Sequence, residues 1–188
     1  EFSKDIKNIN AKNEKVSENQ IFVIDSGNNR IQIFDLDGDG YLISARRSSY
    51  LYMIERETKE ITWSARENHW GGQHDAQILE NGNLLIFANG FKTQGAGLPF
   101  SQVIEFNSKT GEEVWTYRGD PTWTFNSPHI SGCQRLGNGN TLICEGLWGR
   151  IFEVTPEGDI VWEYISPFDG WISSAGGNGN WIFRALRY

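Results

Sequence analysis

The sequence has few cysteines, no long apolar run and no excess of positive charge, and each absence removes a class of protein. Two cysteines in 188 residues are too few for a disulfide scaffold. The chain lacks any apolar run of about 18 residues, the minimum for a membrane-spanning helix. A formal net charge of −7 argues against general binding of nucleic acid, which requires clustered Lys and Arg. Residues 1–19 are polar and lack the apolar stretch of a signal peptide, so we expect a lead-in followed by one domain over residues 20–188.

A turn and strand pattern occurs three times along this domain. An Asn-Gly or Asp-Gly turn precedes a Leu/Ile-rich strand, a second apolar strand follows, and another turn leads to a tryptophan. The first turns contain Gly40, Gly82 and Gly139, and the units end near Trp63, Trp115 and Trp162. Repeats of this size made of short strands are typical of β-propeller blades. We therefore predict an all-β chain with about three four-stranded antiparallel blades, in which the three tryptophans occupy equivalent positions.

The predicted units cover residues 29–66, 74–118 and 129–165, with partial terminal strands that include a closing strand at 180–188. Most propellers have more than three blades. The ring is therefore incomplete, or it closes as a very small propeller, or a second copy or a partner chain completes it.

The two cysteines flank one of the predicted turns. If Asn138 and Gly139 form a two-residue hairpin turn, Cys133 lies opposite Cys144. That pair falls at a hydrogen-bonded site, where the Cα atoms are further apart and a disulfide forms less easily. We expect two buried free thiols.

Two of the three histidines precede the first strand of a unit. His74 and His129 occupy similar positions in neighbouring units, so their imidazoles are predicted to project toward one axis of the propeller. The alternative is that each caps a turn by bonding a backbone carbonyl, which is the favoured interpretation of His129 and of His69.

Several segments, in order, resemble the C-terminal half of the bacterial-type arylsulfotransferases: "QHDAQILENGNLLIFANG", "SQVIEFNSKTGEEVWTYRGDP", "FNSPHISGCQRLGNGNTLICEGLWGRIFEVTPEGDIVWEY" and "NWIFRALRY". The resemblance implies a propeller that moves a sulfuryl group from an aryl sulfate to a phenol through a sulfated histidine, without a nucleotide sulfate donor or another cofactor. His74 of "QHDA" matches the nucleophile, Arg46 of "LISAR" matches an arginine that binds the sulfuryl oxygens, and His129 is a second channel group. The resemblance also implies a periplasmic or extracellular location.

The match departs from the family at one signature. The family has an H-x-N motif ahead of the strand that leads to the arginine, and here the register gives Gly27, Asn28 and Asn29. Asn29 is kept as an oxyanion-binding candidate and the histidine is lost. A non-catalytic propeller that binds or assembles with partners is therefore the alternative function.

A run of alternating aspartates precedes the first unit's second strand. Asp35, Asp37, Asp39 and Gly40 fit the first half of a calcium loop, but its twelfth position holds Arg46 in place of the required Glu. A carboxylate-rich hairpin turn is the favoured interpretation, with calcium binding as the alternative.

Overall fold

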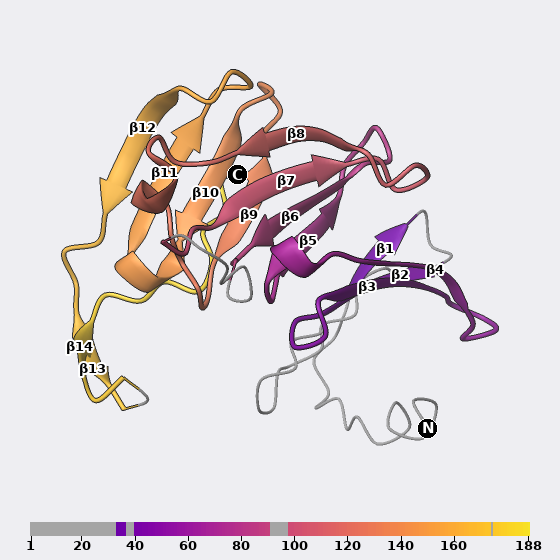
Figure 1. Cartoon of the computed structure of the whole chain (residues 1–188), viewed down its shortest axis with the longest axis horizontal. Helices are drawn as coiled ribbons and strands as arrows, with labels where there is room; N and C mark the ends of the chain where they lie inside the picture. The colour runs from indigo at the N-terminus through magenta and orange to yellow at the C-terminus, as the bar shows by residue number, and fades with distance from the viewer. Residues whose placement is uncertain (1–32, 37–39, 91–97, 174) are drawn as a thin grey trace.

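The computed structural model describes residues 33–36, 40–90, 98–173 and 175–188, which form strands joined by short turns (Figure 1). Three four-stranded antiparallel sheets follow one another along the chain, and in each sheet the strand order is the chain order. Their strands are β1 (Ile33–Leu36), β2 (Gly40–Ala45), β3 (Tyr50–Glu55) and β4 (Ile61–Arg66); β5 (His74–Ile78), β6 (Leu84–Ala88), β7 (Gln102–Phe106) and β8 (Glu113–Tyr117); and β9 (Gly132–Arg135), β10 (Thr141–Glu145), β11 (Arg150–Val154) and β12 (Ile160–Ile165). We call them sheets 1, 2 and 3. The prediction of an all-β propeller-type fold with three four-stranded blades is confirmed.

Only single-turn helices interrupt the strands within the described part of the chain. They are the 3-10 turns η2 (Asn68–Trp70), η3 (Thr122–Thr124) and η4 (Gly146–Trp148). A small hairpin follows sheet 3 and contains β13 (Gly170–Ile172) and β14 (Gly177–Gly179). None of the helices in these residues is long and apolar enough to span a membrane.

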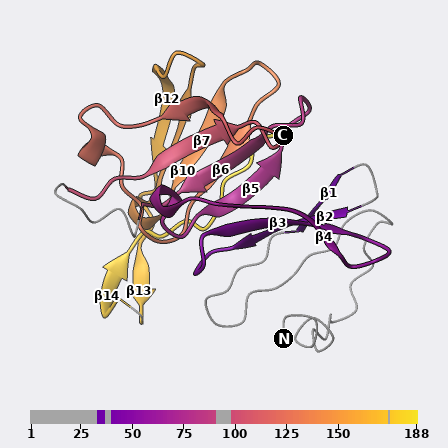
Figure 2. The same cartoon turned by 45° about the vertical axis from the view of Figure 1, so that its right-hand side comes forward.

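Sheet 2 lies between the other two sheets and is buried on both faces (Figures 1 and 2). Successive side chains of a strand point to opposite faces, so β6 divides its residues between two cores. Leu84 and Ile86 pack with residues of sheet 1, whereas Leu85 and Phe87 pack with residues of sheet 3. This double burial explains why "LLIFA" is a continuous apolar run, where a strand with one exposed face would alternate.

The tryptophans of the three units occupy equivalent positions, as predicted. Each is the third residue of the fourth strand of its sheet, and each is preceded on that strand by a one-residue shift in the pairing with the third strand. Trp63 packs against the core between sheets 1 and 2, and Trp115 packs against the core between sheets 2 and 3. Trp162 of sheet 3 is 49% exposed.

The described sheets form an open arc and do not close a ring (Figure 1). Every residue of β12 is exposed, so the edge strand of sheet 3 is uncovered. The closing strand predicted at 180–188 is not formed. These residues bind loops and side chains of sheet 3 instead: Ile182 N–H donates to the Gly146 carbonyl (2.9 Å), and Arg187 N–H donates to Gln134 Oε1 (2.8 Å).

The two cysteines are buried and free, as expected, but they do not face each other. Cys133 lies opposite Ile143, and Cys144 lies opposite Gly132. The loop has three residues, 137–139, closed by a bond from Leu136 N–H to the Asn140 carbonyl (2.8 Å), and Gly139 is left-handed with φ of 89°. The two-residue turn predicted at Asn138-Gly139 was wrong, and a shift of one residue places the two thiols on opposite faces of the sheet.

Candidate functional site

His74 is the first residue of β5 and is only 4% exposed. Two left-handed glycines, Gly71 and Gly72, turn the chain from η2 into this strand. His74 pairs with Phe87 of β6, and the register then shifts before Gln77. The bulge includes Asp75, whose φ of 50° is in the left-handed region that non-glycine residues rarely adopt. The local backbone thus holds the imidazole inside the protein at the start of the central sheet.

The structure brings His74, His129 and Arg46 into one region. The rings of His74 and His129 are 6.4 Å apart between centroids and nearly perpendicular, although His129 lies three residues before β9 and so is not in the position equivalent to His74. Arg46 follows β2, and its Nη2 donates to the carbonyl of Pro128, the residue before His129 (3.4 Å). A Cβ placed on Gly72 would lie 3.8 Å from Arg46 Cζ, so the guanidinium also lies beside the loop that leads to His74.

A fully buried amide holds the imidazole of His74. Asn89 directly follows β6, and its Oδ1 lies 2.6 Å from His74 Nδ1. The Asn89 amide nitrogen donates to the Ser127 carbonyl (2.6 Å) and to Ser131 Oγ (2.8 Å). Both serines belong to the connection between sheets 2 and 3, so this network joins the central sheet to its neighbour around the histidine.

Asp75, next to His74, forms a second buried polar cluster. Its carboxylate accepts the Cys133 N–H (3.0 Å) and pairs with Arg184 (3.1 Å). Burial, and next the charge of Asp75, raise the pKa of the Cys133 thiol well above its usual value. The thiol is therefore protonated at neutral pH, and it is unsuited to act as a nucleophile.

Asn89 was missed from the sequence, although the repeat contains a signal that identifies its position. The second strand of each sheet carries a leucine in the same row as the tryptophan of that sheet: Leu42, Leu85 and Leu142. Counting four residues onward from each leucine gives Arg46, Asn89 and Gly146. The position that supplies the arginine in sheet 1 thus supplies the asparagine in sheet 2.

Several predicted candidates lie elsewhere. Asn29 lies outside the described residues, as do Asp37 and Asp39, and Asp35 is part of β1. The calcium alternative therefore remains a prediction. His69 is on the surface, where its Nε2 lies 2.6 Å from Glu113 Oε1, in place of the backbone carbonyl expected for a turn cap.

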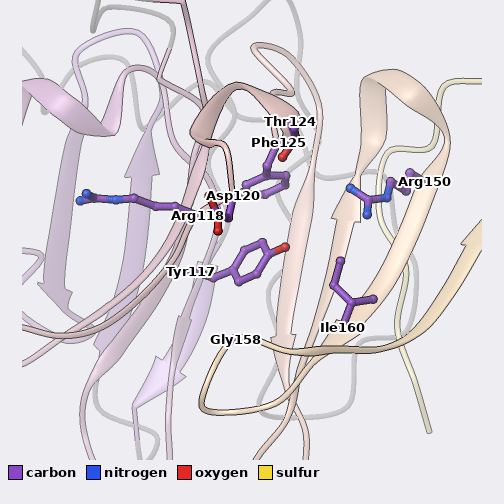
Figure 3. A pocket seen from close by; sticks show the side chains of 8 residues that line it. All are labelled: Tyr117, Arg118, Asp120, Thr124, Phe125, Arg150, Gly158 and Ile160. Carbon is purple, nitrogen blue, oxygen red and sulfur yellow. The ribbon is translucent and has the colours of Figure 1, made fainter.

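A separate cavity of about 230 Å³ opens beside β8 and η3 (Figure 3). Tyr117 directs its hydroxyl toward the side that bears Arg150 and Ile160, while Arg118 points away. Arg150 is bound by two carboxylates, Glu145 and Glu163. The lining contains none of His74, His129 or Arg46, so this cavity is not the region in which the candidates meet.

The sequence matches the arylsulfotransferase (ASST) family over residues 5–167. No curated protein matches it at a significant level. Similar solved structures include a protein of unknown function from Bacteroides caccae (21% identity, covering 74% of this chain and 48% of that one, TM-score 0.49). A streptogramin B lyase is 14% identical (75% and 42% covered, TM-score 0.54), and virginiamycin B lyase from Staphylococcus aureus is 14% identical (78% and 42% covered, TM-score 0.49).

The chain spans less than half the length of each of these structures. The likeness to the streptogramin B lyase, whose TM-score exceeds 0.5, is a likeness of fold alone. The family match is broader, because it covers most of the 188 residues. On this basis the chain belongs to the arylsulfotransferase (ASST) family.

Proposed function

We propose that the chain transfers a sulfuryl group from an aryl sulfate to a phenol through a sulfated His74. The observation that carries the proposal is the meeting of a buried His74 with His129, at 6.4 Å between rings, beside the Arg46 side chain. Membership of the arylsulfotransferase family supports the same reaction class.

The three side chains suit three different tasks in this reaction. A neutral imidazole nitrogen can attack sulfur and later act as a leaving group, which is the role proposed for His74. The planar guanidinium of Arg46 matches the oxygens of a transferring sulfuryl group and would stabilise charge that develops on them. His129 is proposed as a second group of the site that could exchange a proton with the phenolic oxygen, and Asn29 is kept as a further oxyanion-binding candidate.

The competing proposal is a non-catalytic propeller that binds partners. The observation that favours it is in the sequence, where Gly27-Asn28-Asn29 stands in place of the family's H-x-N motif. Both proposals are compatible with the same fold, so only an assay of the reaction at His74 can distinguish them.

The deciding experiment uses 4-nitrophenyl sulfate as donor and an unsubstituted phenol as acceptor. We expect release of nitrophenolate and, without acceptor, a mass gain of one SO3 group on a peptide containing His74. His74→Ala should abolish both signals. His69→Ala is the matched control, because it removes a histidine at the surface. Turnover that survives His74→Ala would exclude the covalent route, and the absence of labelling in the unaltered chain would favour the binding module.

Arg46 provides a second, graded test. Arg46→Ala should slow transfer by roughly 10²-fold or more, the usual effect of removing a charge partner of the transition state. Arg46→Lys keeps the charge and loses the planar fork, so it should recover only part of the rate. Equal rates for the unaltered chain and Arg46→Ala would remove Arg46 from the mechanism.

Two further proposals follow from the family. We propose a periplasmic or extracellular location, which cell fractionation with an antibody against the chain would test. We also propose that a second copy or a partner chain completes the ring beside the exposed edge strand of sheet 3, β12.

A further inference from the structure

The orientation of the Asn89 amide is fixed by its neighbours. Its nitrogen lies 2.6 Å from the Ser127 carbonyl, and a carbonyl oxygen can only accept a hydrogen bond. If the amide were rotated by 180°, two oxygens would face each other at that distance. The nitrogen therefore faces Ser127, and the amide oxygen faces His74.

This orientation determines which nitrogen of His74 carries the proton. Asn89 Oδ1 can only accept, so Nδ1 at 2.6 Å must donate. In the neutral ring the other nitrogen, Nε2, then holds the lone pair. We propose that Asn89 is a positioning residue that fixes His74 in the tautomer whose Nε2 attacks sulfur. The part concerning sulfur rests on the function proposed above, whereas the tautomer does not depend on it.

The network around the amide leaves it little freedom to rotate. Asn89 is fully buried, and its own carbonyl accepts a bond from Ser101 Oγ (3.1 Å). Ser101 Oγ also accepts the N–H of Ser127 (2.8 Å), the residue whose carbonyl binds the amide. The backbone of the asparagine is thus tied to Ser101 and its amide to Ser127, and these two serines are bonded to each other, so the amide is oriented before any substrate binds.

A neutral acceptor suits the chemistry better than a carboxylate. In the transfer step the Nε2 lone pair forms the N–S bond while the S–O bond to the aryl group breaks, and that electron pair leaves on the phenolate oxygen. The ring becomes cationic, its proton stays on Nδ1 and remains hydrogen-bonded to Asn89 Oδ1, and the sulfuryl group keeps one negative charge. A carboxylate would favour the protonated ring before reaction and remove the nucleophile, which an amide does not do.

The first test reads the tautomer directly, in the absence of substrate. The chain has three histidines, so ¹⁵N-labelled protein gives few ring signals, and single His→Ala variants assign them. Near neutral pH we expect the His74 ring to show the proton on Nδ1. In Asn89→Leu, which has similar volume and no acceptor, we expect the proton to move to Nε2 or to be shared. Asn140→Leu is the matched control, since that amide binds Glu153 on sheet 3. A proton on Nε2 in the unaltered chain would overturn the proposal.

The second test uses 4-nitrophenyl sulfate turnover. Asn89→Leu should lower kcat by roughly 10²-fold with little change in KM, because it alters the nucleophile and not the binding of the donor. Ser131→Ala, which removes one of the two acceptors of the amide nitrogen, should lower kcat less. It serves as the milder variant if Asn89→Leu does not fold. Unchanged kcat in a folded Asn89→Leu would overturn the role.

Asn89→Asp separates positioning from simple structural support. The carboxylate keeps an acceptor and favours the cationic ring, so the acid limb of the pH–rate profile should move to higher pH. The other charged or titratable groups around His74 are unchanged in this variant: His129, Arg46, Asp75 and Arg184. An unshifted acid limb would count against the proposal. An inactive unaltered chain with the proton on Nδ1 would reject the proposed function and leave the tautomer assignment standing.

Discussion

Replacing Trp115 with alanine should destabilise the chain much more than replacing Trp162, although the two residues are equivalent in the repeat. The Trp115 indole N–H donates to the Pro156 carbonyl (2.7 Å), and the Arg135 guanidinium lies 4.6 Å from the ring centroid. A fully buried tryptophan loses about 3–5 kcal/mol on truncation to alanine, so a partly buried one loses about 2. The hydrogen bond adds about 1 kcal/mol and the cation–π contact about 0.5–1. The sum for Trp115→Ala is about 3.5–4 kcal/mol.

Trp162 has fewer contacts of this kind. It is 49% exposed and stacks on Tyr164 at 6.5 Å between ring centroids, on the exposed edge strand of sheet 3. Its loss should lower the free energy of unfolding by about 1 kcal/mol or less. Urea unfolding followed by far-ultraviolet circular dichroism would measure both variants at several protein concentrations. Equal losses would refute the reasoning, since they would mean that another sheet covers Trp162 in solution, and light scattering would then report an assembly larger than one chain.

Two further predictions concern residues near Asp75, the neighbour of His74. Burial raises the pKa of the Cys144 thiol to about 12 and that of Cys133 well above its usual value. At pH 8 both should therefore be thiols and should resist alkylation until the chain unfolds, and rapid alkylation of the folded protein, followed by mass spectrometry, would contradict this burial. Gly132→Ala should slow sulfuryl transfer, because its Cβ would lie 2.7 Å from Asp75 Oδ2 and displace the carboxylate beside His74, while Gly137→Ala, which meets nothing within 4 Å, is the control. Equal turnover of these two variants would show that displacing the Asp75 carboxylate does not affect sulfuryl transfer.

The sequence was a good guide where one physical signal acts locally. Turn glycines separated by short apolar strands were sufficient to predict the three sheets, and the recurring tryptophans were sufficient to place equivalent rows. His74 and His129 were predicted to converge because each precedes the first strand of a neighbouring unit, and their rings do meet. The roles proposed for them remain to be tested by experiment.

The sequence was a poor guide where two local solutions have similar energies or where a contact is long-range. Asn138-Gly139 is compatible with a two-residue turn and with a three-residue loop ending in a left-handed glycine, and the choice changes which face carries Cys133. Asn89 looks like an ordinary polar residue at a strand end. Its partners, His74 and the 127–131 connection, lie 15 to 42 residues away, so only the fold reveals the network.

The segment 180–188 makes the histidine region depend on the last residues described. Arg184 reaches the carboxylate next to His74, and Ile182 is bound to the turn at Gly146. Segments held mainly by loops and exposed side chains are usually among the first to open in native-state fluctuations. Each opening of this segment would leave Asp75 as a buried carboxylate without its cation, a state that is costly to maintain. The charge balance of the residue next to His74 therefore depends on a contact with a residue more than a hundred positions further along the chain.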